Sequence, residues 1–255
     1  MKHMSSIKRD KSDLFCLIQQ DAKNTCEEDV SSIDILENKI LRFKDIEDLF
    51  IFNLVDDLDQ EKLSINFYNL FLKYISSNTN ALKFLEADLL ATFTRDPACK
   101  NHYDPILFFK GYKALQLHRL GHWLWNKKEY FSALATQSLI SELYQVDIHP
   151  SCVIGKGIMI DHATRVVIGE RVLIGDNISL LHSVTIIAPK VEDLVVIEDN
   201  VLISAGASII GNINIKKGAK VGAGSLVIEN VSEGSTVVGV PSRCLLYTSP
   251  SPRDQ

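Results

Sequence analysis

Residues 197–227 read IEDNVLISAGASIIGNINIKKGAKVGAGSLV, with an aliphatic residue at every sixth position. The same period, with one short slip, also runs from Ile148 to Ile186. An α-helix requires a period near 3.6 and a half-buried strand a period of 2, so neither explains a period of six. Hexapeptide repeats are typical of a parallel β-helix, in which each unit makes one strand and one corner and three units close a triangular coil. We therefore expect a β-helix over residues 146–243.

Residues 33–145 differ, with apolar residues at helical spacing and few turn signals. One apolar stripe runs over residues 81–93 and ends before Pro97, which disfavours helix in the residue that precedes it. The sequence predicts an α+β protein, with an α-helical domain over 33–145 and the β-helix domain after it.

The two ends of the chain lack both patterns. Residues 1–32 contain no apolar signal-peptide core and are rich in Lys, Asp, Glu and Ser, so we expect a flexible segment or a weak helix. Residues 244–255 follow the last repeat and resemble translated adaptor or vector sequence. We expect this tail to be non-native and to lie outside the fold.

Composition and charge limit what the protein is expected to bind and where it is expected to lie. The net charge of −5 argues against nucleic acid, which usually binds a basic patch. No apolar run approaches 18 residues, so no membrane span is expected. The five cysteines show neither CxxC pairs nor metal-ligand spacing, so we expect no metal site. Reduced thiols favour a cytoplasmic compartment, with an organelle left open.

Two polar residues near the start of the β-helix could support catalysis. Asp147 and His162 are fifteen residues apart. If eighteen residues make each coil, these two lie about one coil apart, offset by half a side, and the carboxylate can reach the imidazole. A histidine oriented by an aspartate is a general-base arrangement. The alternative is a polar surface histidine on a solenoid.

Several motifs resemble the signature of the serine O-acetyltransferases, a family of hexapeptide-repeat acyltransferases. The resemblance is specific from about residue 85 to residue 243 and weaker over residues 33–84. The matching stretches are RDPAC (95–99), FKGYKALQ (109–116), DIHP (147–150), IGKGIM (154–159), DHAT (161–164), VVIGE (166–170), GAKVGAGS (218–225) and VVGVPSR (237–243).

The resemblance implies a reaction and an assembly. The family transfers the acetyl group of acetyl-CoA to the hydroxyl of L-serine, which gives O-acetylserine for cysteine biosynthesis, and acetyl-CoA is then a co-substrate. The family fold is a helical N-terminal domain followed by a left-handed parallel β-helix. The resemblance also implies a homotrimer or a hexamer, with the site between neighbouring β-helices.

Residue roles follow from the same resemblance. His162 would be the general base and Asp147 its orienting partner. Asp96 and Asp161 would bind the serine amino group, and Glu170 occupies an acidic position near the site. The CoA arm would run along the coil edges, beside Ala205, Gly206, Gly222 and Ala223.

Residues 186–197 depart from the family pattern. The glycines found there in the family are missing, as are an Arg that binds the serine carboxylate and a second His. The Gly that usually follows DHAT is Arg165. We expect Arg165 or Lys190 to supply the missing cation. Two alternatives follow: a catalytically impaired paralogue that keeps the trimeric scaffold, or a hexapeptide acetyltransferase for another small acceptor.

A further partner is implied by the family's C-terminal tail. That tail ends in Ile and enters the active site of O-acetylserine sulfhydrylase. This chain ends in Gln255, which argues against the association.

Overall fold

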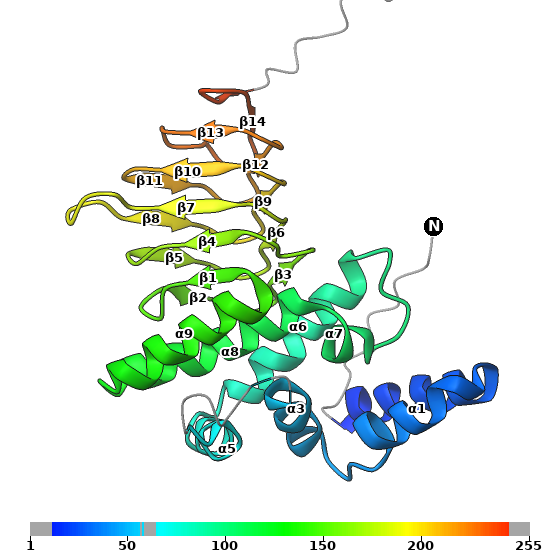
Figure 1. The fold of residues 1–255 in the computed structure, drawn as a ribbon. Helices are drawn as coiled ribbons and strands as arrows, with labels where there is room; N and C mark the ends of the chain where they lie inside the picture. Colours follow the sequence, from blue (N-terminus) through cyan, green and yellow to red (C-terminus); the bar gives the residue numbers. More distant parts are fainter. Residues whose placement is uncertain (1–11, 57, 59–64, 245–255) are drawn as a thin grey trace, which may run out of the picture.

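A computed structural model describes residues 12–56, 58 and 65–244 of the 255-residue chain. A group of helices lies under one end of a stacked β-helix (Figure 1). The helices, in chain order, are α1 (Ser12–Glu28), η1 (Val30–Ser32), α2 (Ile33–Leu36), η2 (Glu37–Leu41), α3 (Ile46–Val55), α5 (Phe67–Ser77), α6 (Ala81–Arg95), α7 (Asp104–Leu107), α8 (Lys110–Asn126) and α9 (Tyr130–Tyr144).

The β-helix has three sheets, and every pairing is parallel except that of β14 with β15. The first sheet contains β1 (Val146–Ile148), β4 (Val166–Ile168), β7 (Thr185–Ile187), β10 (Ser208–Ile210) and β13 (Leu226–Val227). The second contains β2 (Val153–Ile154), β5 (Val172–Ile174), β8 (Val195–Ile197) and β11 (Ile213–Ile215). The third contains β3 (Met159–Ile160), β6 (Ser179–Leu180), β9 (Leu202–Ile203), β12 (Lys220–Val221), β14 (Thr236–Val238) and β15 (Arg243–Cys244).

The sixfold aliphatic residues form the interior of the coils, as the sequence predicts. In the third sheet Ile160 pairs with Leu180, Leu180 with Ile203, and Ile203 with Val221. All four side chains are buried, and full burial of one such side chain contributes about 1.5–3 kcal/mol. Stacking along these columns therefore stabilises the β-helix, and the predicted fold class is confirmed.

The first coil is longer than the repeat suggests. Asp147 pairs with Val167, twenty residues further on, and Val153 pairs with Leu173 at the same separation. The extra length lies in the turn 161–165 between β3 and β4. Positions eighteen apart therefore do not stack in this coil.

Helix α1 corrects the expected domain organisation. Leu14, Ile18 and Ala22 recur at a spacing of four and are buried against the other helices. Of the two expectations for residues 1–32, a flexible segment or a weak helix, the structure has the helix over Ser12–Glu28, and this helix packs with those expected over residues 33–145. The signal for this helix in the sequence is weak, because its apolar stripe is short and many of its other residues are charged.

The two ends of the chain extend beyond the described residues. Residues 1–11 and 245–255 lie outside the described structure, so the expectations for them stay predictions. Within the described ranges, no helix is both long and apolar enough to cross a bilayer.

A buried ion pair fixes the helices to the β-helix. The Asp88 carboxylate accepts hydrogen bonds from Arg119 Nε at 3.0 Å and Nη2 at 2.8 Å, and from the Ile158 N–H at 2.9 Å. Arg119 also donates to the carbonyls of Ile154 and Gly155. Breaking a buried ion pair is strongly destabilising, because it leaves a buried charge without a partner. The pair therefore restricts the two helices to one position against the β-helix. The middle parts of α6 and α8 are thereby joined to the first coil.

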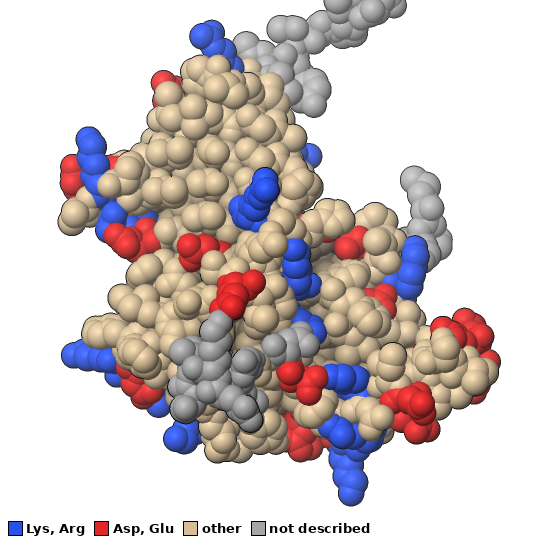
Figure 2. All heavy atoms as spheres, viewed as in Figure 1, with Lys and Arg blue, Asp and Glu red and all other residues tan. Residues whose placement is uncertain are grey.

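Charged side chains are unevenly distributed over the surface. On the face shown in Figure 2, they gather over the helical part and along the left edge, whereas much of the β-helix surface carries neither sign. Outward-facing strand positions include the apolar residues Val153 and Leu173, which are paired neighbours and exposed by 46% and 38%. Exposed apolar neighbours of this kind are suited to contact with another protein surface.

Candidate active site

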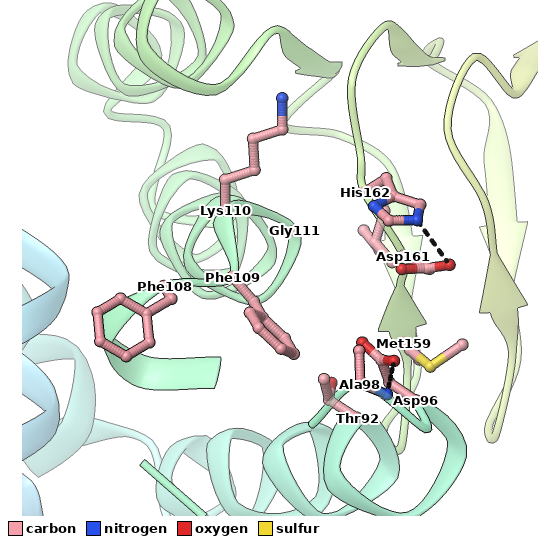
Figure 3. A pocket seen from close by; sticks show the side chains of 11 residues that line it. Thr92, Asp96, Ala98, Phe108, Phe109, Lys110, Gly111, Met159, Asp161 and His162 are labelled. Atoms are coloured by element: carbon pink, nitrogen blue, oxygen red, sulfur yellow. Dashed lines mark hydrogen bonds and ion pairs between the residues drawn. The ribbon is translucent and has the colours of Figure 1, made fainter. Parts of the chain in front are cut away.

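A cavity of about 270 Å³ lies where the helical domain meets the first coil (Figure 3). Its polar lining includes Asp96 from the loop after α6, Lys110 from the start of α8, and Asp161 and His162 from the turn after β3. Apolar side chains such as Phe109 complete the wall. The cavity thus brings together three of the residues expected at the site: Asp96, Asp161 and His162.

Close packing of α8 against β3 builds one side of this cavity. A Cβ atom on Gly111 would lie 2.0 Å from the Ile160 carbonyl oxygen, so only glycine allows this approach. The adjacent Lys110 ammonium donates a hydrogen bond of 2.5 Å to Thr164 Oγ1. The turn after β3 is therefore held by α8 in two ways, through backbone packing at Gly111 and through the hydrogen bond to the Thr164 side chain.

The turn itself has unusual backbone geometry. His162, Ala163 and Arg165 all have positive φ, at 55°, 57° and 62°. The Thr164 N–H donates to the His162 carbonyl at 2.7 Å, and the Arg165 N–H donates to the Gln145 carbonyl at 2.8 Å. This conformation is uncommon for residues with a side chain, and the surrounding contacts maintain it.

The His162 imidazole is the accessible base of the cavity. Its side chain is 73% exposed, and Nε2 lies 3.7 Å from Asp161 Oδ2. The His182 ring lies 5.8 Å away, centroid to centroid, at an angle of 67°. The Asp161 carboxylate is close enough to stabilise a positive charge on the His162 ring, while the exposed ring remains free to contact a substrate.

Asp96 is positioned by the segment in which it lies. Its Oδ1 atom accepts a hydrogen bond from the Ala98 N–H at 2.8 Å. The preceding Arg95 donates from Nη1 to the carbonyls of Gly157 at 3.0 Å and Ile178 at 3.2 Å, which fixes the end of α6 on the β-helix. Asp96 and Asp161 thus supply two carboxylates to one cavity, an arrangement that favours a cationic group.

The expected pairing of Asp147 with His162 is not found. Asp147 Oδ1 accepts a hydrogen bond of 2.6 Å from Gln137 Nε2, on α9. Within the part of the chain that the structure describes, no hydrogen bond or ion pair joins Asp147 to His162. The first coil has twenty residues rather than eighteen, so Asp147 stacks on Val167, five residues beyond His162.

Glu170 and Arg165 also lie outside the cavity of their own chain. Glu170 follows β4, is exposed, and accepts a hydrogen bond of 2.5 Å from Arg171 Nη1. Arg165 is exposed at the end of the turn that carries His162. Lys190 lies between β7 and β8, at the corner of the first and second sheets, whereas His162 lies at the corner of the third and first.

The residues expected to contact CoA share one edge with His162. Strand pairing in the third sheet brings His162, His182, Ala205 and Ala223 into one column. Hydrogen bonds continue along this edge, from the Gly206 N–H to the His182 carbonyl at 3.0 Å and from Gly224 to Ala205 at 2.8 Å. Gly222 precedes Ala223 in the same corner. Small residues thus extend from the cavity along several coils.

Lys110 is the site residue that sequence analysis did not single out. The signal was the dipeptide Lys110-Gly111 at the start of an expected helix, where glycine indicates a close backbone contact. Within the described ranges, no group of three or more His, Cys, Asp or Glu residues could hold a metal ion.

Comparison with known proteins gives one consistent result. Residues 14–117 match the sequence model of a family described as serine acetyltransferase, N-terminal. The chain is 38% identical over 238 residues to a serine acetyltransferase of Buchnera aphidicola subsp. Schizaphis graminum, and the match covers 91% of each chain.

Solved structures agree with the sequence match. The structure of soybean serine acetyltransferase complexed with serine is 40% identical, with a TM-score of 0.87, and the match covers 94% of this chain and 100% of that one. A serine acetyltransferase in complex with CoA is 34% identical, also with a TM-score of 0.87, and the match covers 92% and 100% of the two chains.

Proposed function

This chain belongs to the serine acetyltransferase family, and from that premise we propose that it transfers the acetyl group of acetyl-CoA to the hydroxyl of L-serine. The observation that carries the proposal is the cavity in which Asp96, Asp161 and an exposed His162 meet. These groups match the chemistry of L-serine. The two carboxylates can form ion pairs with its ammonium group, and the imidazole can accept the proton of its hydroxyl.

The reaction requires a base because a serine hydroxyl is a poor nucleophile until its proton is removed. The His162 imidazole takes that proton as the serine oxygen attacks the thioester carbonyl carbon. The new C–O bond forms, the C–S bond breaks, and the imidazolium returns the proton to the leaving CoA sulfur. General-base catalysis of this kind contributes about 10²–10⁴-fold to the rate.

The geometry favours Asp161 over Asp147 as the carboxylate that stabilises the imidazolium. Asp161 lies 3.7 Å from the His162 ring, whereas Asp147 is engaged by Gln137. Asp161 would thus serve both the imidazole and, with Asp96, the ammonium group of serine. If Asp147 orients His162 as the family resemblance implies, Asp147→Asn should lower kcat more than Asp161→Asn does.

The CoA arm would lie along the edge above His162. Ala205, Gly206, Gly222 and Ala223 present little side-chain volume there, so an extended chain can approach the backbone closely. This position would place the thioester at the end of the edge nearest the imidazole.

A homotrimer, alone or paired into a hexamer, would complete the site. The His162 ring is largely exposed in the single chain, and apolar positions such as Val153 face outward. Glu170 and Arg165 lie outside the cavity of their own chain, so their proposed part in serine binding requires a neighbouring chain. Light scattering of the purified protein would determine the number of chains.

Release of free CoA tests the proposed function directly. Purified protein is mixed with acetyl-CoA, with and without L-serine, and the new thiol is measured with a thiol-reactive dye. We expect release that depends on L-serine, with O-acetylserine identified by mass. D-Serine and ethanolamine are the matched acceptors. Release with another acceptor but not L-serine would contradict the choice of substrate, and no release with any acceptor would indicate the impaired paralogue.

A further inference from the structure

We propose that Lys110 binds the carboxylate of the acceptor amino acid in the cavity beside His162. This inference rests on the proposed function, because it concerns how the same site holds L-serine. It assigns to Lys110 the cationic role that the sequence suggested for Arg165 or Lys190.

The charges of the cavity provide the first argument. Among its described lining residues, Asp96 and Asp161 are the acids and Lys110 is the one lysine or arginine. An amino acid carries both an ammonium and a carboxylate group at neutral pH. The two acids suit the ammonium group but repel the carboxylate, so the carboxylate should turn toward Lys110.

The position of Lys110 provides the second argument. Figure 3 shows Lys110 on the helix side of the cavity, with its ammonium directed away from Asp96 and with Asp161 and His162 on the strands opposite. The acids and the ammonium thus lie at different ends of the cavity, and a small zwitterion could extend from one end to the other. Its hydroxyl could then face His162 while its two charged ends contact the two walls.

The Lys110 ammonium also has unused hydrogen-bonding capacity. It carries three N–H donors, and one of them bonds to Thr164 Oγ1. That bond holds the ammonium near the turn that carries His162 and leaves two donors for a carboxylate. Lys110 is only partly exposed, so water competes less for these donors than at an open surface.

Within a single chain, the other cations near the turn are placed less favourably than Lys110. Arg95 is engaged by the carbonyls of Gly157 and Ile178. Arg165 is exposed and outside the cavity lining, and Lys190 lies at a different corner of the β-helix.

A comparison of two acceptors separates carboxylate binding from a purely structural role. L-Serinamide keeps the hydroxyl and amino groups of L-serine but has no carboxylate. In Lys110→Met, we expect KM for L-serine to rise by about tenfold to a hundredfold, because a charge-assisted hydrogen bond is lost. KM for acetyl-CoA and kcat/KM for L-serinamide should change little. The preference for L-serine over L-serinamide should therefore fall toward one.

Three controls accompany this measurement. Lys110→Arg keeps the charge and should recover part of the preference. Lys156→Met removes an exposed lysine outside the cavity and should behave like the unchanged protein. Thr164→Val removes the hydroxyl that holds Lys110 but keeps the charge, so it should retain most of the preference.

Several outcomes would overturn the inference. Equal losses with both acceptors would mean that Lys110 acts only on the shape of the turn, and an unchanged preference would exclude contact with the carboxylate. If Lys110→Met does not fold, Lys110→Gln takes its place in the same comparison. If the unchanged protein gives no turnover, the proposed function fails, and calorimetry then tests Lys110 alone. L-Serine should bind more weakly to the variant, and equal binding would contradict the inference.

Discussion

The turn after β3 contains the proposed base, His162, and several of its residues adopt an unfavourable left-handed backbone conformation. Arg165 stands at φ 62°, where glycine is favoured, and its side chain is exposed. A left-handed conformation costs a residue with a Cβ roughly 1–2 kcal/mol, partly offset by the greater entropy of glycine in the unfolded chain. We predict that Arg165→Gly raises the free energy of unfolding by about 0.5–1 kcal/mol, measured by urea titration.

The matched control is the reverse change at the same edge. Gly224 has φ 65°, and no heavy atom beyond Gly224 and its two chain neighbours lies within 4 Å of where its Cβ would be. Gly224→Ala should therefore lower the free energy of unfolding through backbone conformation alone. A stability gain in Gly224→Ala, or a loss in Arg165→Gly, would contradict this account.

A second prediction at the residue scale concerns His118, on α8. Burial lowers the pKa of His118 to about 3, with His122 and Arg119 contributing in the same direction. The unfolded chain therefore takes up a proton near pH 6.5, whereas the folded chain does not. Stability from this group is complete above pH 6.5 and falls by about 1.4 kcal/mol per pH unit between pH 6.5 and pH 3.

Urea unfolding at pH 7, 6 and 5 measures this dependence. His118→Gln removes the titrating group, so the slope of stability against pH should flatten by about 1 kcal/mol per unit. The readout is the slope rather than the stability itself, since the substitution also changes packing. The same slope in both proteins would show that His118 is not buried in its neutral form. Burial also lowers the pKa of His122, and the remaining slope is expected to come partly from that residue.

At the scale of elements, the contact of α8 with β3 determines where the catalytic turn lies. Gly111→Ala would place a Cβ against the Ile160 carbonyl, which is backbone and cannot move aside without shifting the turn. We predict a loss of about 3 kcal/mol in the free energy of unfolding, together with weaker L-serine binding.

Gly121 provides the control for this prediction on the same helix. A Cβ there would meet its nearest neighbours at 3.7 Å, an ordinary contact. Gly121→Ala should therefore leave activity intact and raise stability by about 0.5–1 kcal/mol, because alanine favours the helix interior. If both substitutions have the same effect, close approach at Gly111 is not what positions the turn.

The length of the first coil shows what the sequence could and could not predict about the site. The sixfold period identified the β-helix and the register of its buried residues. Inward-facing aliphatic side chains recur at this period regardless of which residues form the corners. The slip between Ile160 and Ile168 was also visible in the sequence. Its consequence was missed, because an insertion at a corner lengthens one coil and shifts every relation across it. The register of Asp147 relative to His162 was therefore estimated for a coil of eighteen residues, whereas this coil has twenty.

At the scale of the whole molecule, contacts between distant segments account for the rest. Asp96, Lys110 and His162 meet because the Asp88–Arg119 pair joins α6 and α8 to the first coil. Motifs identified Asp96 and His162, whereas no periodicity marked Lys110 as a neighbour of the turn. Helix α1 was underestimated for a related reason. Its stripe of Leu14, Ile18 and Ala22 is short, and its stability depends on tertiary packing.

The role of His162 as the general base is tested most directly by the rate of CoA release from acetyl-CoA and L-serine, measured for the purified protein and two variants. His162→Asn removes the proposed base, and His182→Asn removes the neighbouring ring, 5.8 Å away along the same edge. We predict a loss of about 100-fold or more for His162→Asn and activity close to that of the unchanged protein for His182→Asn. A His162→Asn variant that keeps the full rate, or equal losses in both variants, would contradict this role.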